Sequence, residues 1–268
     1  MRRATGVVAT SAVDADGDQL TEQSLRALVD QMNDGWMPVV LEHDPRNPPV
    51  GRVVAAKLVR RPDESFAVES EFELFENGDE IPLSEDRKEP DVERNFAVMF
   101  DRSYKDRADR ANVEELAKIL GGRVKQEFNK SVEQISVLTV FGLWAISQLA
   151  GGFLQKLGAD GFDAFKAVLK RIFSKAKGGE QLLLFKFAFE QDGVSGVATV
   201  ILTNPMPADI DAVLSDGLAQ LSAFLAKDFV GELGMREITY EYRDRTLQFS
   251  FAVRRDAVPL TPKRSPVT

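Results

Sequence analysis

A stretch of 22 residues without a single charge, Gln134–Gln155, constrains the fold of this 268-residue chain more than any other feature. It has to be shielded from water, and its length is that of a helix crossing a bilayer. Polar residues and the pair Gly151-Gly152 within the stretch are unusual for a membrane span. Two interpretations therefore stay open: a segment that enters a membrane, and a buried helix packed against protein.

A basic amphipathic helix is predicted directly behind this stretch. In GADGFDAFKAVLKRIFSKAK the apolar residues recur at helical spacing, and Lys166–Lys177 contains five basic residues and no acidic ones. Such a helix binds anionic lipid headgroups. In the membrane interpretation, apolar residues of the stretch and cations of the helix make the contacts: Phe141, Trp144, Lys166, Lys170 and Arg171.

Composition excludes several kinds of site and partner. The chain has no cysteine and a single histidine, His43, which excludes a thiolate nucleophile and zinc sites built on cysteine or on histidine clusters. We therefore expect no metal and no cofactor. A net charge of −8 argues against nucleic acid as a partner. No apolar run follows the first residues, so we expect a cytoplasmic protein, peripheral to the membrane or anchored at its cytoplasmic face in the membrane interpretation.

The first hundred residues predict a β-rich unit with one helix. The helix begins at the N-cap residue Thr21 and ends at Gly35. In FAVESEFEL apolar residues alternate with glutamates, which predicts a strand with one buried and one solvated face. The expected strands are Thr5–Ala12, Pro38–Leu41, Arg52–Val59 and Phe66–Leu74.

The remainder predicts an acidic loop, helices and a second sheet. The loop covers residues 76–95, a short strand follows at Phe96–Phe100, and the next helix has a capping box at Asn112 and Glu115 and ends at Gly121-Gly122. The pattern of residues 181–254 predicts two strands, a helix and two further strands, in this order. We predict an α+β protein: a β-rich domain at 1–104, a central helical segment at 105–179, a small ββαββ antiparallel sheet domain at 180–257 and a disordered tail at 258–268.

The single histidine lies in the string LEHDPRNPPVGRVV, after an apolar strand and before a turn and another strand. Without further context, a lone histidine in such a place is usually a surface residue. The string, however, resembles the histidine motif of the prohead (capsid-maturation) serine proteases of tailed phages, with its His-Asp-like pair, proline and aliphatic-Gly-Arg step. The strings AVDADGDQL and FAVESEFEL are similar to that family's opening turn and next strand, so the resemblance spans residues 4–104.

The resemblance implies that His43 is the base for a serine nucleophile. In the family this serine lies on a strand of Ser-aliphatic-Gly-Phe type, and the matching string here is FAVMFDRSY. Ala97 takes the place of the serine and Met99 that of the glycine, and alanine has no atom that attacks a carbonyl. A displaced nucleophile would be a neighbouring serine: Ser103 or, as further alternatives, Ser84 and Ser70.

We therefore expect a phage-related, protease-like module that binds or assembles without cleaving. The histidine motif supplies the expected binding residues: Glu42, Asp44, Gly51 and Arg52. We expect a protein or peptide partner, self-association into a homo-oligomer and, in the membrane interpretation, an anionic membrane surface. Two alternatives stay open: an active serine endopeptidase that uses His43 and Ser103, and a membrane-inserting effector that acts through residues 134–177.

Overall fold

The computed structural model describes the whole chain except residues 14–18, 77–80, 85–86, 88–94, 105, 127–134, 144–148, 176–178, 192–193, 228–233 and 263–268. Contacts divide it into two compact units. The N-terminal unit comprises residues 1–41, 47–91 and 253–260, and the second unit comprises 42–46, 92–252 and 261–268. Helices and strands occur in both units, which confirms the α+β class.

The N-terminal unit is a small antiparallel sheet covered by one helix. Its elements are β1 (Arg2–Thr10), α1 (Glu22–Asp34), β2 (Pro38–Val39), β3 (Gly51–Arg60) and β4 (Phe66–Leu74), and the strand order is β1-β4-β3-β2. The hydroxyl of Thr21 accepts the amide N–H of Ser24 at 3.1 Å, which caps α1 at its start, and Gly35 follows its end. Both predicted helix boundaries are confirmed.

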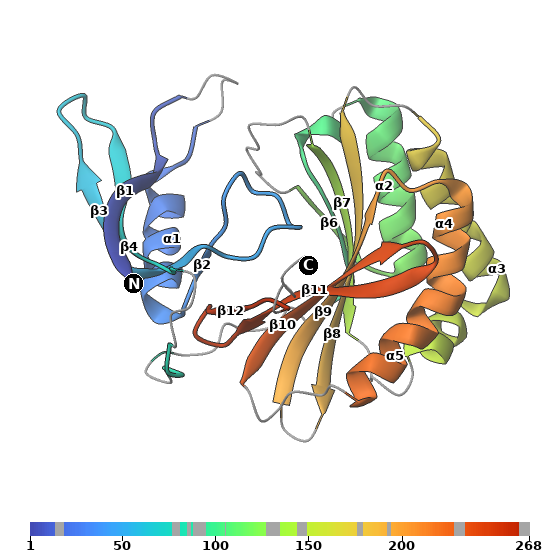
Figure 1. Ribbon diagram of the computed structural model, residues 1–268. Coiled ribbons are helices and arrows are strands. Elements are labelled where there is room, and N and C mark those ends of the chain that lie inside the picture. Colours follow the sequence, from blue (N-terminus) through green and yellow to red (C-terminus); the bar gives the residue numbers. More distant parts are fainter. Residues whose placement is uncertain are drawn as a thin grey trace. The chain divides into compact units, whose positions relative to one another are not determined.

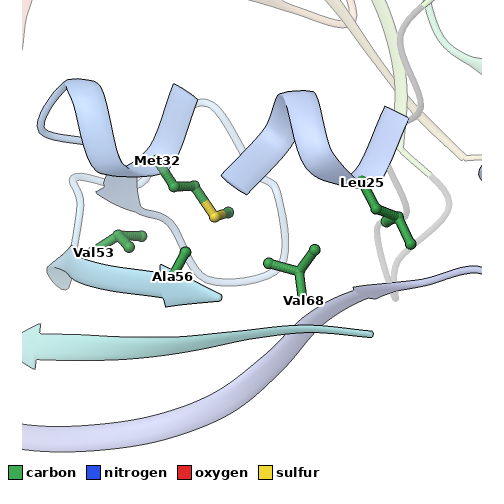
Figure 2. Packing of buried hydrophobic residues seen from close by; sticks show 5 residues of the cluster. All are labelled: Leu25, Met32, Val53, Ala56 and Val68. Carbon is green, nitrogen blue, oxygen red and sulfur yellow. The ribbon is translucent and has the colours of Figure 1, made fainter. Parts of the chain in front are cut away.

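The core of this unit lies between α1 and the sheet. Figure 2 shows Leu25 and Met32 of α1 above Val53 and Ala56 of β3 and Val68 of β4. These side chains are at most 9% exposed. Burying these side chains between the helix and the sheet stabilises the unit.

The second unit contains most of a larger, eight-stranded sheet with the order β12-β11-β10-β9-β8-β7-β5-β6. Figure 1 shows its helices on one side of the sheet. Its elements in chain order are β5 (Ala97–Phe100), the 3₁₀ helix η1 (Arg102–Tyr104), α2 (Arg107–Leu120), β6 (Arg123–Gln126), β7 (Ile135–Leu143), α3 (Leu149–Phe173), β8 (Glu180–Gln191), β9 (Val194–Thr203), α4 (Pro207–Ala212), the π-helix η3 (Val213–Gly217), α5 (Leu218–Lys227), β10 (Met235–Arg243), β11 (Thr246–Arg254) and β12 (Pro259–Leu260). Residues 253–254 at the end of β11 and the whole of β12 belong to the N-terminal unit.

Three helical crossovers make this sheet mixed rather than antiparallel. The pairs β5/β6, β7/β8 and β9/β10 are parallel, and each pair is joined through helix: α2, α3, and α4 with α5. The expected strand order from 181 onward is confirmed, but the expected antiparallel sheet is wrong for β9 and β10. A helix between two neighbouring strands returns the chain to the same end of the sheet, so the second strand runs parallel to the first.

The uncharged stretch is divided between a strand and the start of a helix. Residues 135–143 form β7, which pairs with β5 and β8, and residues 149–155 begin α3. Both helical interpretations were therefore wrong for 135–143. A strand in the middle of a sheet is buried on both faces and reads as a continuous apolar run, which periodicity does not distinguish from a buried helix.

Two smaller expectations also changed. Helix α2 ends at Gly121 as predicted, but it begins near its N-cap Asp106 rather than at Asn112, because the carboxylate of Asp106 accepts the amide of Asp109 at 2.6 Å. In the expected disordered tail, residues 259–260 form β12 and Val258 is buried. Residues 263–268 lie outside the described residues.

Candidate functional site

The histidine loop, residues 41–46, holds His43 at an exposed turn. Glu42 and His43 have φ angles of 59° and 53°, so two successive non-glycine residues adopt the left-handed conformation. Each such residue costs roughly 1–3 kcal/mol and persists only where the surroundings enforce it. Leu41, Glu42 and His43 are all exposed. The loop therefore presents its histidine to solvent at the energetic cost of a strained backbone.

A partly buried ion pair braces the loop. Asp44 accepts the backbone N–H of Arg46 at 2.9 Å, and the Arg46 guanidinium lies 2.7 Å from Asp44 and 2.7 Å from Glu180. Burial raises the pKa of Asp44, but the hydrogen bonds and the charge of Arg46 outweigh burial and hold it below its usual value. The predicted binding residue Asp44 thus holds the turn in place.

The other two predicted binding residues belong to the packing of the N-terminal unit. A Cβ atom on Gly51 would lie 2.6 Å from the carbonyl oxygen of Glu73, so only glycine fits where β3 and β4 approach. Arg52 is 8% exposed; its guanidinium pairs with Glu73 at 2.7 Å and with Asp256 at 3.4 Å. The Gly-Arg step of the motif is explained here by strand packing and a buried ion cluster.

This ion cluster was not anticipated from the sequence. Trp36 is stacked between two guanidinium groups, those of Arg52 at 4.0 Å and Arg87 at 4.2 Å from the ring centroid. Arg87 donates to backbone carbonyls at the end of α1 and in β3: Met32, Gly35, Val53 and Val54. Arg87 comes from the predicted acidic loop, so part of that loop is bound to the N-terminal unit. No local sequence signal could have revealed the cluster, because Trp36, Arg52 and Arg87 lie far apart along the chain.

The expected nucleophile position is part of the larger sheet. Ala97 is 0% exposed in β5, where it pairs with Arg123 of β6 and Phe141 of β7. It packs in a cluster with Phe141, Ala188 and Met99. The small side chain at this position fits a crowded sheet interior.

Ser103 uses its hydroxyl in a local turn. Its Oγ donates to Asp101 at 2.5 Å and its amide N–H donates to the same oxygen at 2.8 Å. The same Asp-x-Ser arrangement recurs at Asp63 and Ser65, at 2.6 and 3.0 Å. In the described part of the chain no hydrogen bond joins Ser103 to His43. The structure thus places Ser103 in a turn motif with Asp101.

We expect no covalent labelling of this protein by a fluorophosphonate serine probe. The Ser103 proton is held by a carboxylate, a much weaker base than imidazole at neutral pH. Intact-mass spectrometry after incubation checks this, with a reactive serine hydrolase in the same tube as the positive control. A probe adduct on Ser103 that disappears in Ser103→Ala would overturn the expectation.

The predicted membrane-contacting residues are engaged within the protein. Phe141 is 5% exposed in β7. In α3, Lys166 pairs with Asp163, Lys170 with Asp211 of α4, and Arg171 with Glu115 of α2, at 2.6–3.0 Å. Trp144 lies outside the described residues. Among the helices that the structure describes, none has the length and hydrophobicity needed to cross a bilayer.

A cluster of polar side chains lies on the larger sheet. Like the ion cluster around Arg52, it was not predicted from the sequence. Thr199 donates to Glu237 at 2.7 Å, and the Lys186 ammonium lies 3.3 Å from the same carboxylate. Burial raises the pKa of Glu237, but Lys186, Thr199 and Arg236 outweigh it and keep the pKa below its usual value. In the described residues no cluster of three or more His, Cys, Asp or Glu side chains is arranged to hold a metal ion.

The edges of the two sheets differ in how well they are protected. Edge strands β2 and β12 are two residues long and begin with proline, and β6 is four residues long and carries Arg123 and Lys125. Short length and proline are among the usual protections against strand addition. The fourth edge, β1, has nine residues, and Val7 and Val8 are 46% and 40% exposed beside a β-bulge.

Comparison of the chain with protein-family models, with curated proteins and with solved structures finds no match.

Proposed function

We propose that the chain is a non-catalytic, protease-like binding module whose N-terminal unit accepts an extended segment of a partner protein along β1. One observation carries this proposal: β1 is a nine-residue edge strand with two exposed valines, whereas the other edge strands are only two to four residues long. Within the described residues, β1 pairs only with β4, and no described strand pairs with its other side.

Strand addition suits both the backbone and the side chains of this edge. An added strand satisfies the open N–H and C=O groups, and alternate side chains provide specificity. The bulge between Val7 and Ala9 gives β1 one extra residue, so Val7 and Val8 are both accessible to a partner. Such exposed valines favour β-branched or aromatic residues on the added strand.

The resemblance to prohead proteases favours the same function, since a protease binds its substrate in an extended conformation. Loss of the nucleophile converts such a protein into one that binds without cleaving. The position that matches the nucleophile is a buried alanine, and the neighbouring Ser103 is held by Asp101. These two facts favour a binding module over the endopeptidase alternative.

Selection from displayed random peptides of about ten residues, long enough to cover β1, tests the proposal. We expect wild type to enrich extended, β-branched sequences and the double variant Val7→Lys, Val8→Lys to lose at least tenfold of that enrichment, because lysine on an edge disfavours strand addition. Val13→Lys is the matched control: Val13 is 63% exposed but lies outside β1. Equal enrichment on wild type and the double variant, or none on either, would overturn the proposal.

A further inference from the structure

The charged residues of β1 are all positive, and they form no ion pair in the described part of the chain. Arg2 and Arg3 are exposed, and the strand contains no acidic residue. The residue directly across from Arg3 on β4 is Glu73, but its carboxylate is engaged by Arg52 at 2.7 Å. The residue across from Arg2 is Leu74. The N-terminal end of β1 therefore carries two arginines that form no ion pair within the described residues; Glu71, the next acidic residue of β4, lies across from Thr5.

We infer that the segment accepted by β1 is acidic, with two successive carboxylates at the end that lies beside Arg2 and Arg3. Neighbouring residues of a strand point to opposite faces of the sheet. Arg2 and Arg3 therefore present one guanidinium on each face, and a pair of adjacent acidic residues on the added strand matches both. This inference rests on the proposed strand addition and specifies the chemistry of its partner.

Charge favours an acidic peptide over a second copy of this chain at the same edge. Two β1 strands paired antiparallel about Gly6 would place Arg2 and Arg3 across from Thr10 and Ala9, which offer no negative charge. Four arginines would then lie in one two-stranded ribbon without a compensating group. An acidic strand instead forms opposite-charge cross-strand pairs, which stabilise an antiparallel arrangement.

The net charge of −8 determines which experiment can detect the contribution of Arg2 and Arg3. It repels an acidic peptide at long range, while Arg2 and Arg3 attract it at contact, and salt weakens both effects. A salt titration would mix the two contributions. Reversing the charge of the arginines and of the peptide separates them.

The test measures binding of three fluorescein-labelled peptides of about ten residues, in which valine and threonine alternate, by fluorescence anisotropy. They differ only at the C-terminal pair, which is Asp-Asp, Ser-Ser or Lys-Lys and lies beside Arg2 and Arg3 in antiparallel addition. We expect wild type to bind the Asp-Asp peptide about two- to thirtyfold more tightly than the Ser-Ser peptide, because two cross-strand ion pairs are gained. In Arg2→Glu, Arg3→Glu the order should reverse in favour of Lys-Lys.

Arg60→Glu, Arg61→Glu is the matched control, since it reverses two successive arginines at the far end of the same sheet. We expect it to keep the wild-type order of the three peptides. Equal binding of all three peptides to wild type, abolished by Val7→Lys, Val8→Lys, would overturn the acidic partner and leave strand addition standing. Binding of no peptide, together with dimerisation in sedimentation that Val7→Lys, Val8→Lys abolishes, would overturn both in favour of a second copy.

Discussion

Replacing Arg52 with methionine is expected to lower the free energy of unfolding of the N-terminal unit by about 3–5 kcal/mol, the cost of removing one partner from a buried ion pair. Arg52 is 8% exposed, Glu73 is 13% exposed and Asp256 is fully buried. Methionine fills much of the space of arginine but leaves Glu73 as a buried carboxylate without its cation. It also removes one of the two guanidinium groups stacked on Trp36.

Hydrogen–deuterium exchange of the β3 and β4 amides measures this effect in the N-terminal unit alone. The matched control is Arg26→Met in the same unit: Arg26 pairs with Glu22 at 2.5 Å but is 63% exposed, so its loss should cost below about 1 kcal/mol. Adding Glu73→Gln to Arg52→Met should recover part of the loss, since no buried charge is then left unpaired. Equal effects of Arg52→Met and Arg26→Met would show that burial of the cluster does not matter.

The ion cluster around Arg52 could not be predicted from the sequence. Arg52 and Asp256 are 204 residues apart, yet both belong to the N-terminal unit. Asp256 also accepts from Arg254 and from the backbone of Ser84, so residues near the C-terminus complete a unit that otherwise ends at residue 91. No local pattern in the sequence connects these segments, because the connection is made by side chains of distant residues.

Elements with a strong local signal were predictable. Thr21 and Gly35 mark the ends of α1, and the alternating FAVESEFEL forms β4 over the predicted residues 66–74. A cap or a period-two pattern acts within a few residues, so one sequence contains all the information it requires. The order of elements from β8 to β11 was predicted on the same grounds.

Elements defined by their neighbours were not predictable. The uncharged run at 135–143 is a strand because β5 and β8 flank it on both sides, and the run itself is equally compatible with a helix. The parallel direction of β10 follows from the crossover through α4 and α5. At the candidate site, the sequence motif singled out His43, Gly51 and Arg52, but only the packing distinguishes the exposed histidine from the buried arginine.

Replacing Asp101 with alanine is expected to destabilise the second unit by about 3 kcal/mol. Asp101 is 5% exposed, and its carboxylate accepts hydrogen bonds from the hydroxyl and the amide of Ser103 and from the amide of Val137 at 2.6 Å. Alanine leaves the buried Val137 N–H in β7 without its acceptor. Exchange of the β7 amides should then become faster by about two orders of magnitude.

Asp63→Ala is the control for this prediction, because Asp63 makes the same two bonds to Ser65 at the surface. It leaves no buried amide unpaired, so we expect β3 and β4 amides to exchange at close to their wild-type rates. Ser103→Ala removes only one of the three bonds to Asp101 and should have a much smaller effect than Asp101→Ala. If Ser103→Ala were as damaging as Asp101→Ala, the hydroxyl rather than the bond to Val137 would account for most of the stabilisation, and the prediction would be wrong. A small effect of Ser103→Ala beside a large one of Asp101→Ala would mean that the carboxylate stabilises the junction of β5 and β7 and that the serine is accessory to it.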